Sequence, residues 1–281
     1  DHQRVILPNL DAGCSMADMA NREQVESCWE QIGSVVGGGM RRTHPWGMVP
    51  ITYVNSSADL KAFCGEHGGA VCTSSNARGV VAWAVSQGER VLFFPDEHLG
   101  RNTAVKLGIA LDRCIVWDPE QPMGGNTPEA VAAARAILWK GFCSVHQRFS
   151  VAQIAAAREK HPGARIIVHP ECRLEVVQAA DDDGSTEYII QKVSEAPAGT
   201  IWGVGTEVNL VHRLAQQHPD QRVFCLDPIV CPCETMYRIH PRFLLWALDN
   251  LLRGEVVNEI VVDPRVIAHA RVALDRMLSI A

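Results

Sequence analysis

The stretch TYVNSSADL (residues 52–60) recurs as IVHPECRLE (residues 167–175), and this recurrence decides how we interpret the fold. Two further pairs of segments align at a similar offset, namely TSSNARGVV (73–81) with GSTEYIIQK (184–192) and RVLFFPDEHLG (90–100) with GTIWGVGTEVNL (199–210). Both copies have the pattern of a strand, a polar turn, a helix, a second helix, a strand, an acidic turn and a helix. Self-similarity at a period of about 110 residues indicates at least two copies of one α/β unit.

Short runs rich in Val and Ile alternate with longer helical patterns along the whole chain. The predicted strands are residues 48–54, 90–94, 114–117, 165–168, 200–204, 221–225 and 259–262. The predicted helices are residues 16–32, 57–66, 76–88, 98–109, 128–139, 150–161, 173–180, 186–195, 207–217, 235–253 and 264–279. Strands that alternate with helices indicate parallel sheets covered by helical layers, so we predict an α/β fold.

The composition excludes several classes of protein. The chain has 281 residues, of which 47% are hydrophobic and 21% charged, and its formal net charge is −6. A nucleic-acid-binding surface needs a basic patch, so nucleic acid is not an expected partner. No apolar run approaches the ~20 residues of a membrane span, and no signal peptide is recognised. The ten cysteines are scattered rather than arranged as a short disulfide framework, so we expect a cytoplasmic protein with mostly reduced thiols.

Three cysteines far apart in the sequence share one local setting. Cys14, Cys143 and Cys233 each stand just ahead of a predicted helix. A thiolate in that place is favoured by the positive end of the helix dipole. Three such thiolates could meet at one metal centre, and three protein ligands to a four-iron cluster would leave one iron open for substrate. Four other cysteines lie inside helix or strand patterns and are expected in the core: Cys28, Cys64, Cys72 and Cys114.

The spacing of the cysteines leaves other metal and redox functions open. Cys231-Pro-Cys233 is the only close pair in the chain. A structural zinc site normally has a second Cys or His pair, which the sequence lacks, and a redox dithiol normally has the spacing C-x-x-C. Iron–sulfur ligation by separated cysteines has no diagnostic spacing of its own.

Polar residues gather just after the predicted strands. They are Asn55, Ser75 and Asp96 in one copy of the repeat and His169, Glu171, Thr186 and Glu207 in the other. Ligands of open α/β sheets bind beyond the carboxyl ends of the strands, so the two polar edges could face one shared cavity. Two of these residues, Ser75 and Thr186, lie at predicted helix starts, where they could cap the helix or bind a substrate carboxylate.

A histidine and a His–Glu pair are the candidate acid–base groups. His146 follows Cys143 by three residues, so in a helical turn both would face the same side. His169 and Glu171 follow a predicted strand directly, and such a pair could bind a carboxylate and move a proton. The alternative for this pair is a solvent-facing turn without chemistry.

Taken together, these motifs resemble the quinolinate synthase family, the [4Fe–4S] enzymes of de novo NAD biosynthesis. The matching stretches are AGCSMADM (12–19), YVNSSADLKAFC (53–64), VCTSSNA (71–77), FFPDEHLGRNTA (93–104), LWKGFCSVHQRF (138–149), HPGARIIVHPEC (161–172), GSTEYI (184–189) and CPCETMYRIHPRFLLWALDNL (231–251). They cover the chain from about residue 5 to its end. The order of C-S-V-H-Q, V-H-P-E-C and C-x-T-M makes the resemblance specific.

The resemblance implies three α/β/α units around a pseudo-threefold axis, with the cluster at their junction. It implies Cys14, Cys143 and Cys233 as the ligands, and its C-x-x-M-x-x-I pattern selects Cys233 rather than its neighbour Cys231. The corresponding domain boundaries are residues 1–35 with 234–281 for the first unit, 36–142 for the second and 143–233 for the third. The family pattern starts with a further N-terminal segment that brings a His and a Tyr to the active site, so we expect the first unit to be incomplete here.

The resemblance also implies a reaction and a role for each candidate residue. The family condenses iminoaspartate with dihydroxyacetone phosphate to quinolinate, and the open iron acts as a Lewis acid. Iminoaspartate is supplied by an L-aspartate oxidase or dehydrogenase, which is a possible partner. Tyr53 and Asn55 would contact substrate, and Tyr53 and His169 would assist the general acid/base Glu171. The remaining contacts to carboxylate or phosphate groups would come from Ser75, His146, His169 and Thr186.

Two further classes stay open on the sequence alone. A catalytically impaired iron–sulfur or redox-sensing relative would lack the N-terminal active-site segment but keep the cluster. A plain α/β binding protein would carry the same cysteines without metal.

Overall fold

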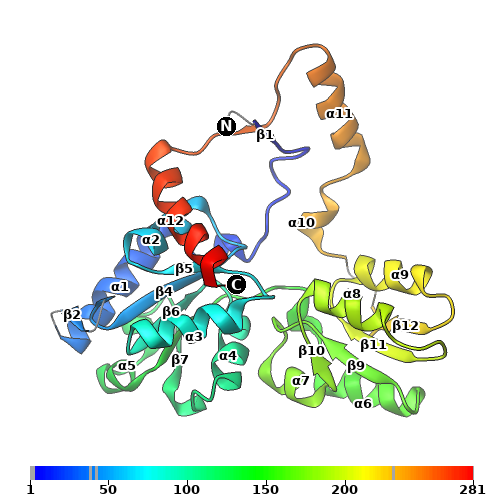
Figure 1. The fold of residues 1–281 in the computed structure, drawn as a ribbon, viewed down its shortest axis with the longest axis horizontal. Helices are drawn as coiled ribbons and strands as arrows, with labels where there is room; N and C mark the ends of the chain where they lie inside the picture. Colours follow the sequence, from blue (N-terminus) through cyan, green and yellow to red (C-terminus); the bar gives the residue numbers. More distant parts are fainter. Residues whose placement is uncertain (1–3, 38–39, 42–43, 230–231, 281) are drawn as a thin grey trace.

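The computed structural model describes residues 4–37, 40–41, 44–229 and 232–280. Two parallel sheets lie next to each other, and a smaller arch of chain rises above them (Figure 1). The predicted α/β class is confirmed, since parallel sheets are flanked by helices. No helix in the described part of the chain is both long and apolar enough to cross a membrane.

The first sheet has five parallel strands in the order β5-β4-β6-β8-β7. The strands are β4 (Met48–Tyr53), β5 (Ala70–Cys72), β6 (Arg90–Phe94), β7 (Cys114–Trp117) and β8 (Ala136–Trp139). Successive residues of a strand point to opposite faces, and both faces of this sheet are buried. The helices that pack on it are α1 (Arg22–Val36), α2 (Ala58–Glu66), α3 (Ala77–Gln87), α4 (Glu97–Lys106), α5 (Pro128–Ala133) and α12 (Pro264–Ile280).

The two faces of the first sheet have separate hydrophobic cores. Leu92 and Phe94 of β6 pack with residues of α1, α2, α5 and α12. Val91 and Phe93 of the same strand pack with residues of α3 and α4 on the other face. The four cysteines predicted in the core are buried, which confirms that prediction: Cys28, Cys64, Cys72 and Cys114.

The second sheet has four parallel strands in the order β10-β9-β11-β12. The strands are β9 (Arg165–Val168), β10 (Asp182–Asp183), β11 (Ile201–Gly205) and β12 (Arg222–Cys225). Helices α6 (Val151–Lys160) and α7 (Leu174–Ala179) cover one face, and α8 (Thr186–Ser194) and α9 (Val208–Gln217) cover the other. The order β10-β9-β11 repeats the order β5-β4-β6 of the first sheet, so the repeat seen in the sequence is a repeat of structure.

The arch consists of the segments outside the two sheets. β1 (Val5–Ile6) pairs antiparallel with β13 (Glu259–Ile260), and α10 (Glu234–Tyr237) and α11 (Pro241–Leu252) lead from the second sheet to that pair (Figure 1). The chain then returns through α12, which packs on α2 and β5. The remaining short elements are β2 (Met40–Arg41), β3 (His44–Pro45), η1 (Ala17–Met19), η2 (Leu111–Arg113), η3 (Pro122–Gly125) and η4 (His146–Arg148). The pseudo-threefold axis and the predicted division into three units stay predictions.

Three of the predicted elements are corrected by the structure. The helix predicted at 128–139 ends at Ala133, and residues 136–139 form β8 in the middle of the sheet, because all four of its residues are buried there. The helix predicted at 16–32 starts only at Arg22, after Asn21 forms a capping box. The helix predicted at 235–253 is two helices, since Pro241 begins the second one.

Strand β5 (Ala70–Cys72) was not predicted. Its three residues are too few for a strand pattern in the sequence, yet they pair with β4 over their full length.

Candidate active site

A cavity of about 390 Å³ lies between the carboxyl ends of the strands of the two sheets. Of the residues to which the family resemblance assigns a role, all except Ser75 line it: Cys14, Tyr53, Asn55, Cys143, His146, His169, Glu171, Thr186 and Cys233. Of the other two predicted strand-end residues, Glu207 lines the cavity and the fully buried Asp96 does not. Tyr53 ends β4 and His169 follows β9, so the strand-end position of these residues brings them together from both sheets. The expectation of one cavity shared by two polar edges is confirmed.

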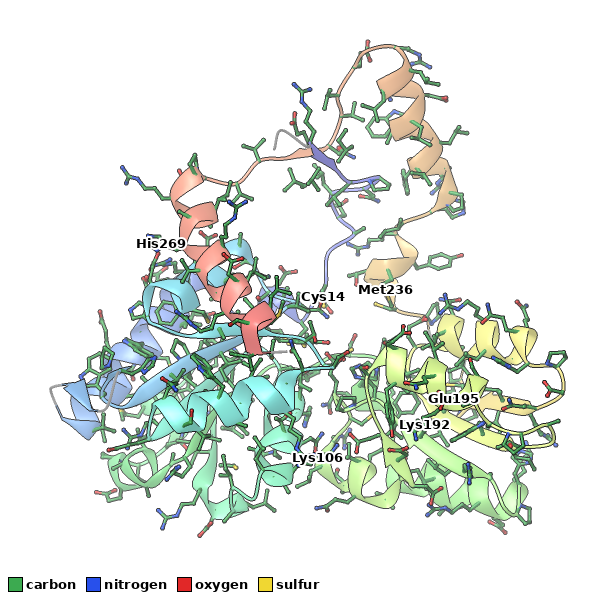
Figure 2. All side chains as sticks on the ribbon, viewed as in Figure 1. Cys14, Lys106, Lys192, Glu195, Met236 and His269 are labelled. Atoms are coloured by element: carbon green, nitrogen blue, oxygen red, sulfur yellow. The ribbon has the colours of Figure 1, made fainter. Side chains whose placement is uncertain are left out.

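The three predicted cysteine ligands reach this cavity from three different segments. Cys14 comes from the N-terminal segment ahead of η1, Cys143 from the loop after β8, and Cys233 caps the start of α10. Figure 2 shows Cys14 and Met236 of α10 close to the junction of the two sheets. Cys143 packs against the core of the first sheet together with Cys14, and against the core of the second together with Cys233. Cys231, the alternative to Cys233, lies outside the described residues.

The thiol groups are available as ligands. Cys14, Cys143 and Cys233 are half-buried and form no disulfide within the described part of the chain. Burial raises the pKa of Cys14, while the backbone N–H groups of Ala17 and Met16 donate to its sulfur and oppose that shift. These N–H groups belong to the turn that opens η1, so Cys14 stands ahead of a short 3-10 turn rather than ahead of the predicted helix, which begins only at Arg22.

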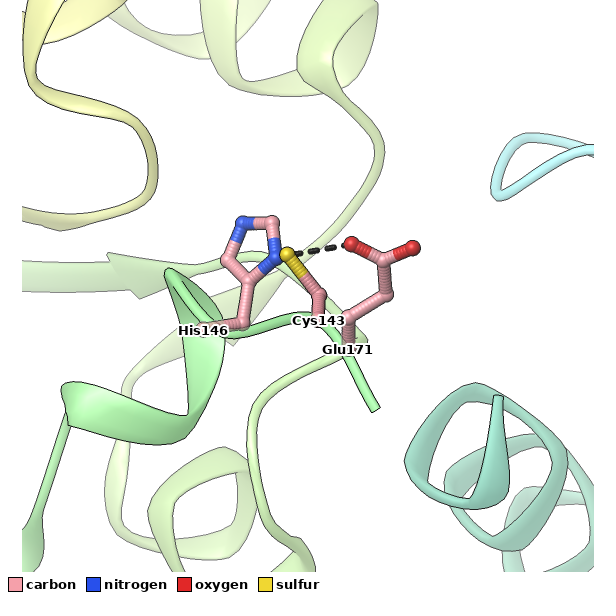
Figure 3. Close-up of side chains that lie close together, drawn as sticks. All are labelled: Cys143, His146 and Glu171. Carbon is pink, nitrogen blue, oxygen red and sulfur yellow. Dashed lines mark ion pairs between the residues drawn. The ribbon is translucent and has the colours of Figure 1, made fainter. Parts of the chain in front are cut away.

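A compact group of three donor side chains stands beside the cysteines. The ligand atoms of Cys143, His146 and Glu171 all lie within 4.8 Å of one another and could hold a metal ion (Figure 3). Nδ1 of His146 is 2.7 Å from Oε2 of Glu171. The expectation that Cys143 and His146 face the same side is confirmed, and η4 supplies the helical turn that places His146 there.

His169 and Glu171 are buried, so the alternative of a solvent-facing turn is wrong. Each side chain is only 3% exposed. The ring of His169 stacks on the ring of His146, with 4.4 Å between their centroids. The backbone N–H of Glu171 donates to Nδ1 of His169 (3.3 Å), and the same nitrogen lies 3.4 Å from Oε2 of Glu171.

The pKa shifts of these three groups follow from their contacts. Burial would raise the pKa of Glu171, but the neighbouring His169 and His146 and the Tyr53 hydroxyl outweigh it and lower the pKa to about 2. Burial would lower the pKa of His146, but its contacts with Cys143 and Glu171 raise it to about 10. Burial and the adjacent His146 lower the pKa of His169 to about 3. The site therefore holds an ion pair of Glu171 with His146 next to a neutral His169.

Tyr53 ends β4 of the first sheet, and Asn55 lies in the turn that follows it. The hydroxyl of Tyr53 interacts with Glu171 and Ser74, and burial raises its pKa. Two hydrogen bonds stabilise this turn. Lys61 Nζ donates to the carbonyl oxygen of Ser56 (2.6 Å), and the Ser56 hydroxyl donates to the carbonyl oxygen of Tyr53 (2.7 Å). Asn55 is exposed at the cavity wall.

The two residues predicted at helix starts are placed differently. Thr186 lines the cavity, whereas Ser75 lines a neighbouring cavity of about 530 Å³. Ser74 lines both cavities and was missed as a site residue. The residue that caps α8 is Ser185 rather than Thr186, since the Ser185 hydroxyl accepts from the N–H of Tyr188. The N-cap of α3 is Asn76 rather than Ser75.

Thr206 is another wall residue that the sequence analysis missed. Its hydroxyl lies 3.2 Å from Nε2 of His146. It directly follows β11, so the rule that ligands bind at strand ends could have found it.

Comparison with known proteins gives the family. The family described as quinolinate synthetase A protein matches residues 1–279. The chain belongs to the quinolinate synthetase A family. The resemblance found in the motifs is thereby confirmed, and the chain is an enzyme of the quinolinate synthase type.

Individual relatives match along the whole chain. A protein named quinolinate synthase from Corynebacterium glutamicum is 56% identical over 280 residues, which are 100% of this chain and 69% of that protein. Proteins of the same name from Herpetosiphon aurantiacus and Acidobacterium capsulatum are 54% and 55% identical, and each is covered over 74% of its length. These matches do not favour a non-catalytic relative.

Proposed function

We propose that this chain makes quinolinate from iminoaspartate and dihydroxyacetone phosphate, with loss of phosphate and two waters, as a step of NAD biosynthesis in the cytoplasm. The observation that supports this best is the single cavity that Cys14, Cys143 and Cys233 share with the Glu171 network. The names of the relatives support the same product.

The residues present fit a [4Fe–4S] cluster. Thiolates are the ligands that such clusters use, and three unpaired cysteine thiols from separate segments line one cavity. Cys14, Cys143 and Cys233 would hold three irons. When bound, the cluster supplies a Lewis acid at its fourth iron, where an oxygen or nitrogen group of the substrate can bind.

Glu171 is the proposed general acid/base. Its carboxylate lines the cavity and is ionised at neutral pH, so it can accept one of the protons that ring closure to an aromatic product removes from carbon. The Tyr53 hydroxyl contacts Glu171 and orients its carboxylate toward the cavity. The pKa of His169 is lowered, so its ring is neutral at neutral pH and forms no ion pair with Glu171. The ion pair of Glu171 is with His146.

The remaining wall residues are proposed to bind the anionic ends of the substrates. His146 has a raised pKa and carries positive charge that attracts a carboxylate or phosphate. Thr186 lies at the start of α8, where free N–H groups and the helix dipole also favour an anion. Asn55 offers an amide from the opposite wall, and Ser75 would act only through the neighbouring cavity. An L-aspartate oxidase or dehydrogenase is the proposed source of iminoaspartate.

A second candidate is a single metal ion at Cys143, His146 and Glu171. The close approach of their donor atoms favours it, and a Cys–His–carboxylate set suits zinc. In that arrangement His146 and Glu171 would be ligands and neither would be free to act on substrate.

Metal analysis of matched variants separates the two candidates. The protein is reconstituted with iron and sulfide without oxygen, and iron, sulfide and zinc are measured for Cys14→Ala and for His146→Ala. We expect Cys14→Ala to lose the iron and sulfide and His146→Ala to retain them. Retention of metal in Cys14→Ala together with its loss in His146→Ala would establish the single-ion site and overturn the cluster.

A further inference from the structure

Asn102 connects the two α/β units directly behind the proposed acid/base. It lies on α4, which packs on the first sheet, and is only 1% exposed. Its Nδ2 donates to the carbonyl oxygen of Pro170 (2.8 Å) and to that of Cys172 (2.7 Å). These two carbonyl groups flank Glu171 on either side, in the turn after β9 of the second sheet. One side-chain amide therefore holds the main chain before and after the residue that carries the proposed chemistry.

The turn around Glu171 is otherwise held by its own unit. The N–H of His169 donates to the carbonyl oxygen of Gly205 (3.0 Å), and the N–H of Cys172 donates to that of His169 (3.0 Å). These bonds shape the turn but leave the carbonyl groups of Pro170 and Cys172 to Asn102. Since an amide presents two N–H groups in one plane, it matches two neighbouring acceptors at once.

The same helix also holds the loop of Cys143. Asp96 caps α4, and its Oδ1 accepts from the N–H of Leu99 (2.6 Å). The N–H of Glu97, the residue after Asp96, donates to the carbonyl oxygen of Gly141 (2.8 Å). The two segments lie so close that a Cβ at position 141 would collide with the carbonyl oxygen of Pro95. The first turn of α4 thus contacts the Cys143 loop. Asn102 lies about 7.5 Å farther along the helix axis, at the turn of Glu171.

We propose that Asn102 is a positioning residue that sets the Glu171 carboxylate against Cys143 and His146 by clamping the turn after β9 of the second sheet to α4 on the first sheet. The proposal rests on the proposed role of Glu171. The need to fill space does not explain why this residue is an asparagine. Its Oδ1 is buried and has no hydrogen-bond partner among the described residues, which is a cost that packing does not require. An apolar side chain of the same size would fill the space without leaving that oxygen unpaired.

The test replaces the amide with a carboxylate of the same shape. Asn102→Asp loses both donors and turns an acceptor toward two carbonyl groups, so the Glu171 turn should shift. A misplacement of about 1 Å at a reacting group can cost on the order of 100-fold in rate, so we expect kcat per cluster to fall by about 10- to 100-fold with KM within about threefold. The matched control is Asn126→Asp. Asn126 Nδ2 also donates to main-chain carbonyls, of Val116 (2.8 Å) and Gly124 (2.9 Å), but within one unit and away from the cavity.

Two controls distinguish a positioning role of Asn102 from a loss of folded protein. The rate is divided by the iron content of each sample, and the Asn102→Asp change is also made in the Glu171→Gln variant. If Asn102 acts through Glu171, the Asn102→Asp change should cost less than about twofold in the Glu171→Gln background, because contacting residues that act as a unit are not additive. A full additional loss in that background, or an equal loss in Asn126→Asp, would overturn the proposal. Unchanged turnover in Glu171→Gln alone would instead overturn the proposed function of Glu171.

If Asn102→Asp does not fold, Asn102→Ser gives the same comparison. Its hydroxyl can donate to only one of the two carbonyls, so we expect a smaller loss of about 3- to 10-fold in kcat per cluster. Wild-type kcat in folded Asn102→Ser would count against the clamp.

Discussion

The turns after β4 and β9 occupy equivalent places in the two repeated units but carry different chemistry. After β4, the Ser56 hydroxyl donates to the carbonyl of Tyr53, so Ser56 stabilises its own turn. At the aligned position after β9 stands Glu171, whose carboxylate points to the cavity and pairs with His146. The repeat preserves the strand order, while the residue at this aligned position differs: Ser56 bonds to its own turn, and Glu171 brings a carboxylate to the cavity.

We expect the largest loss of metal and of turnover from a change at Cys143, whose loop contacts the cores of both sheets. Cys143→Ala removes the sulfur that lies against the cores of both sheets, so we expect complete loss of the cluster and of turnover. Iron and sulfide per chain and the visible absorption spectrum measure this. The control Cys114→Ala removes a core thiol away from the cavity and should keep the full iron content at a cost of about 1 kcal/mol in stability.

The second prediction tests the aligned turn positions against each other. Glu171→Gln should keep the cluster but lower kcat by about 100- to 10,000-fold, the usual contribution of a general acid/base. Ser56→Ala should lower kcat by less than about threefold, because its hydroxyl bonds to the carbonyl of Tyr53 and to Lys61 Nζ and does not line the cavity. Equal losses in the two variants, at unchanged iron content, would remove the distinction between the units.

The third prediction concerns the contact that crosses from the first sheet, at Tyr53, to Glu171. Tyr53→Phe removes the hydroxyl that interacts with the Glu171 carboxylate and should cost about 10-fold in kcat, the worth of one hydrogen bond to a charged group. Tyr188→Phe is the control, since that hydroxyl donates to Asp182 outside the cavity (2.9 Å). Steady-state kinetics should show normal turnover for Tyr188→Phe.

The smallest effect is expected at the two helix starts. Thr186 and Ser75 align in the repeat, but only Thr186 lines the active-site cavity. Thr186→Ala should therefore raise KM by about 3- to 5-fold, the loss of roughly 1 kcal/mol of binding, and Ser75→Ala should leave KM within about twofold. A larger rise in KM for Ser75→Ala would show that substrate extends into the neighbouring cavity.

Much of the fold could be predicted because local pattern and tertiary role agree. The strands at 90–94, 114–117 and 165–168 have the predicted bounds, since continuous apolar runs of that length are typical of strands buried on both faces. Residues 136–139 were mistaken for helix because an alanine-rich stretch precedes them, and only their place between β6 and β7 makes them a strand.

The site residues that belong to a sequence motif could be predicted. Those whose role depends on how the two sheets pack together could not. The cysteines and the His–Glu pair stand out by their place after strands or ahead of helices. The burial of His169 and Glu171 depends on the second sheet meeting the first, which no local pattern shows. Asn102 gives no signal in the sequence, because its two hydrogen bonds join residues 68 and 70 positions apart.

The central claim is that Cys14, Cys143 and Cys233 hold a four-iron cluster whose fourth iron faces the cavity. Mössbauer spectroscopy of protein reconstituted with iron-57 and sulfide, with and without quinolinate, tests it most directly. We expect ~4 irons per chain, with one iron whose spectrum changes when quinolinate is added. A single metal ion per chain, or four irons whose spectra stay the same when quinolinate is added, would contradict this assignment.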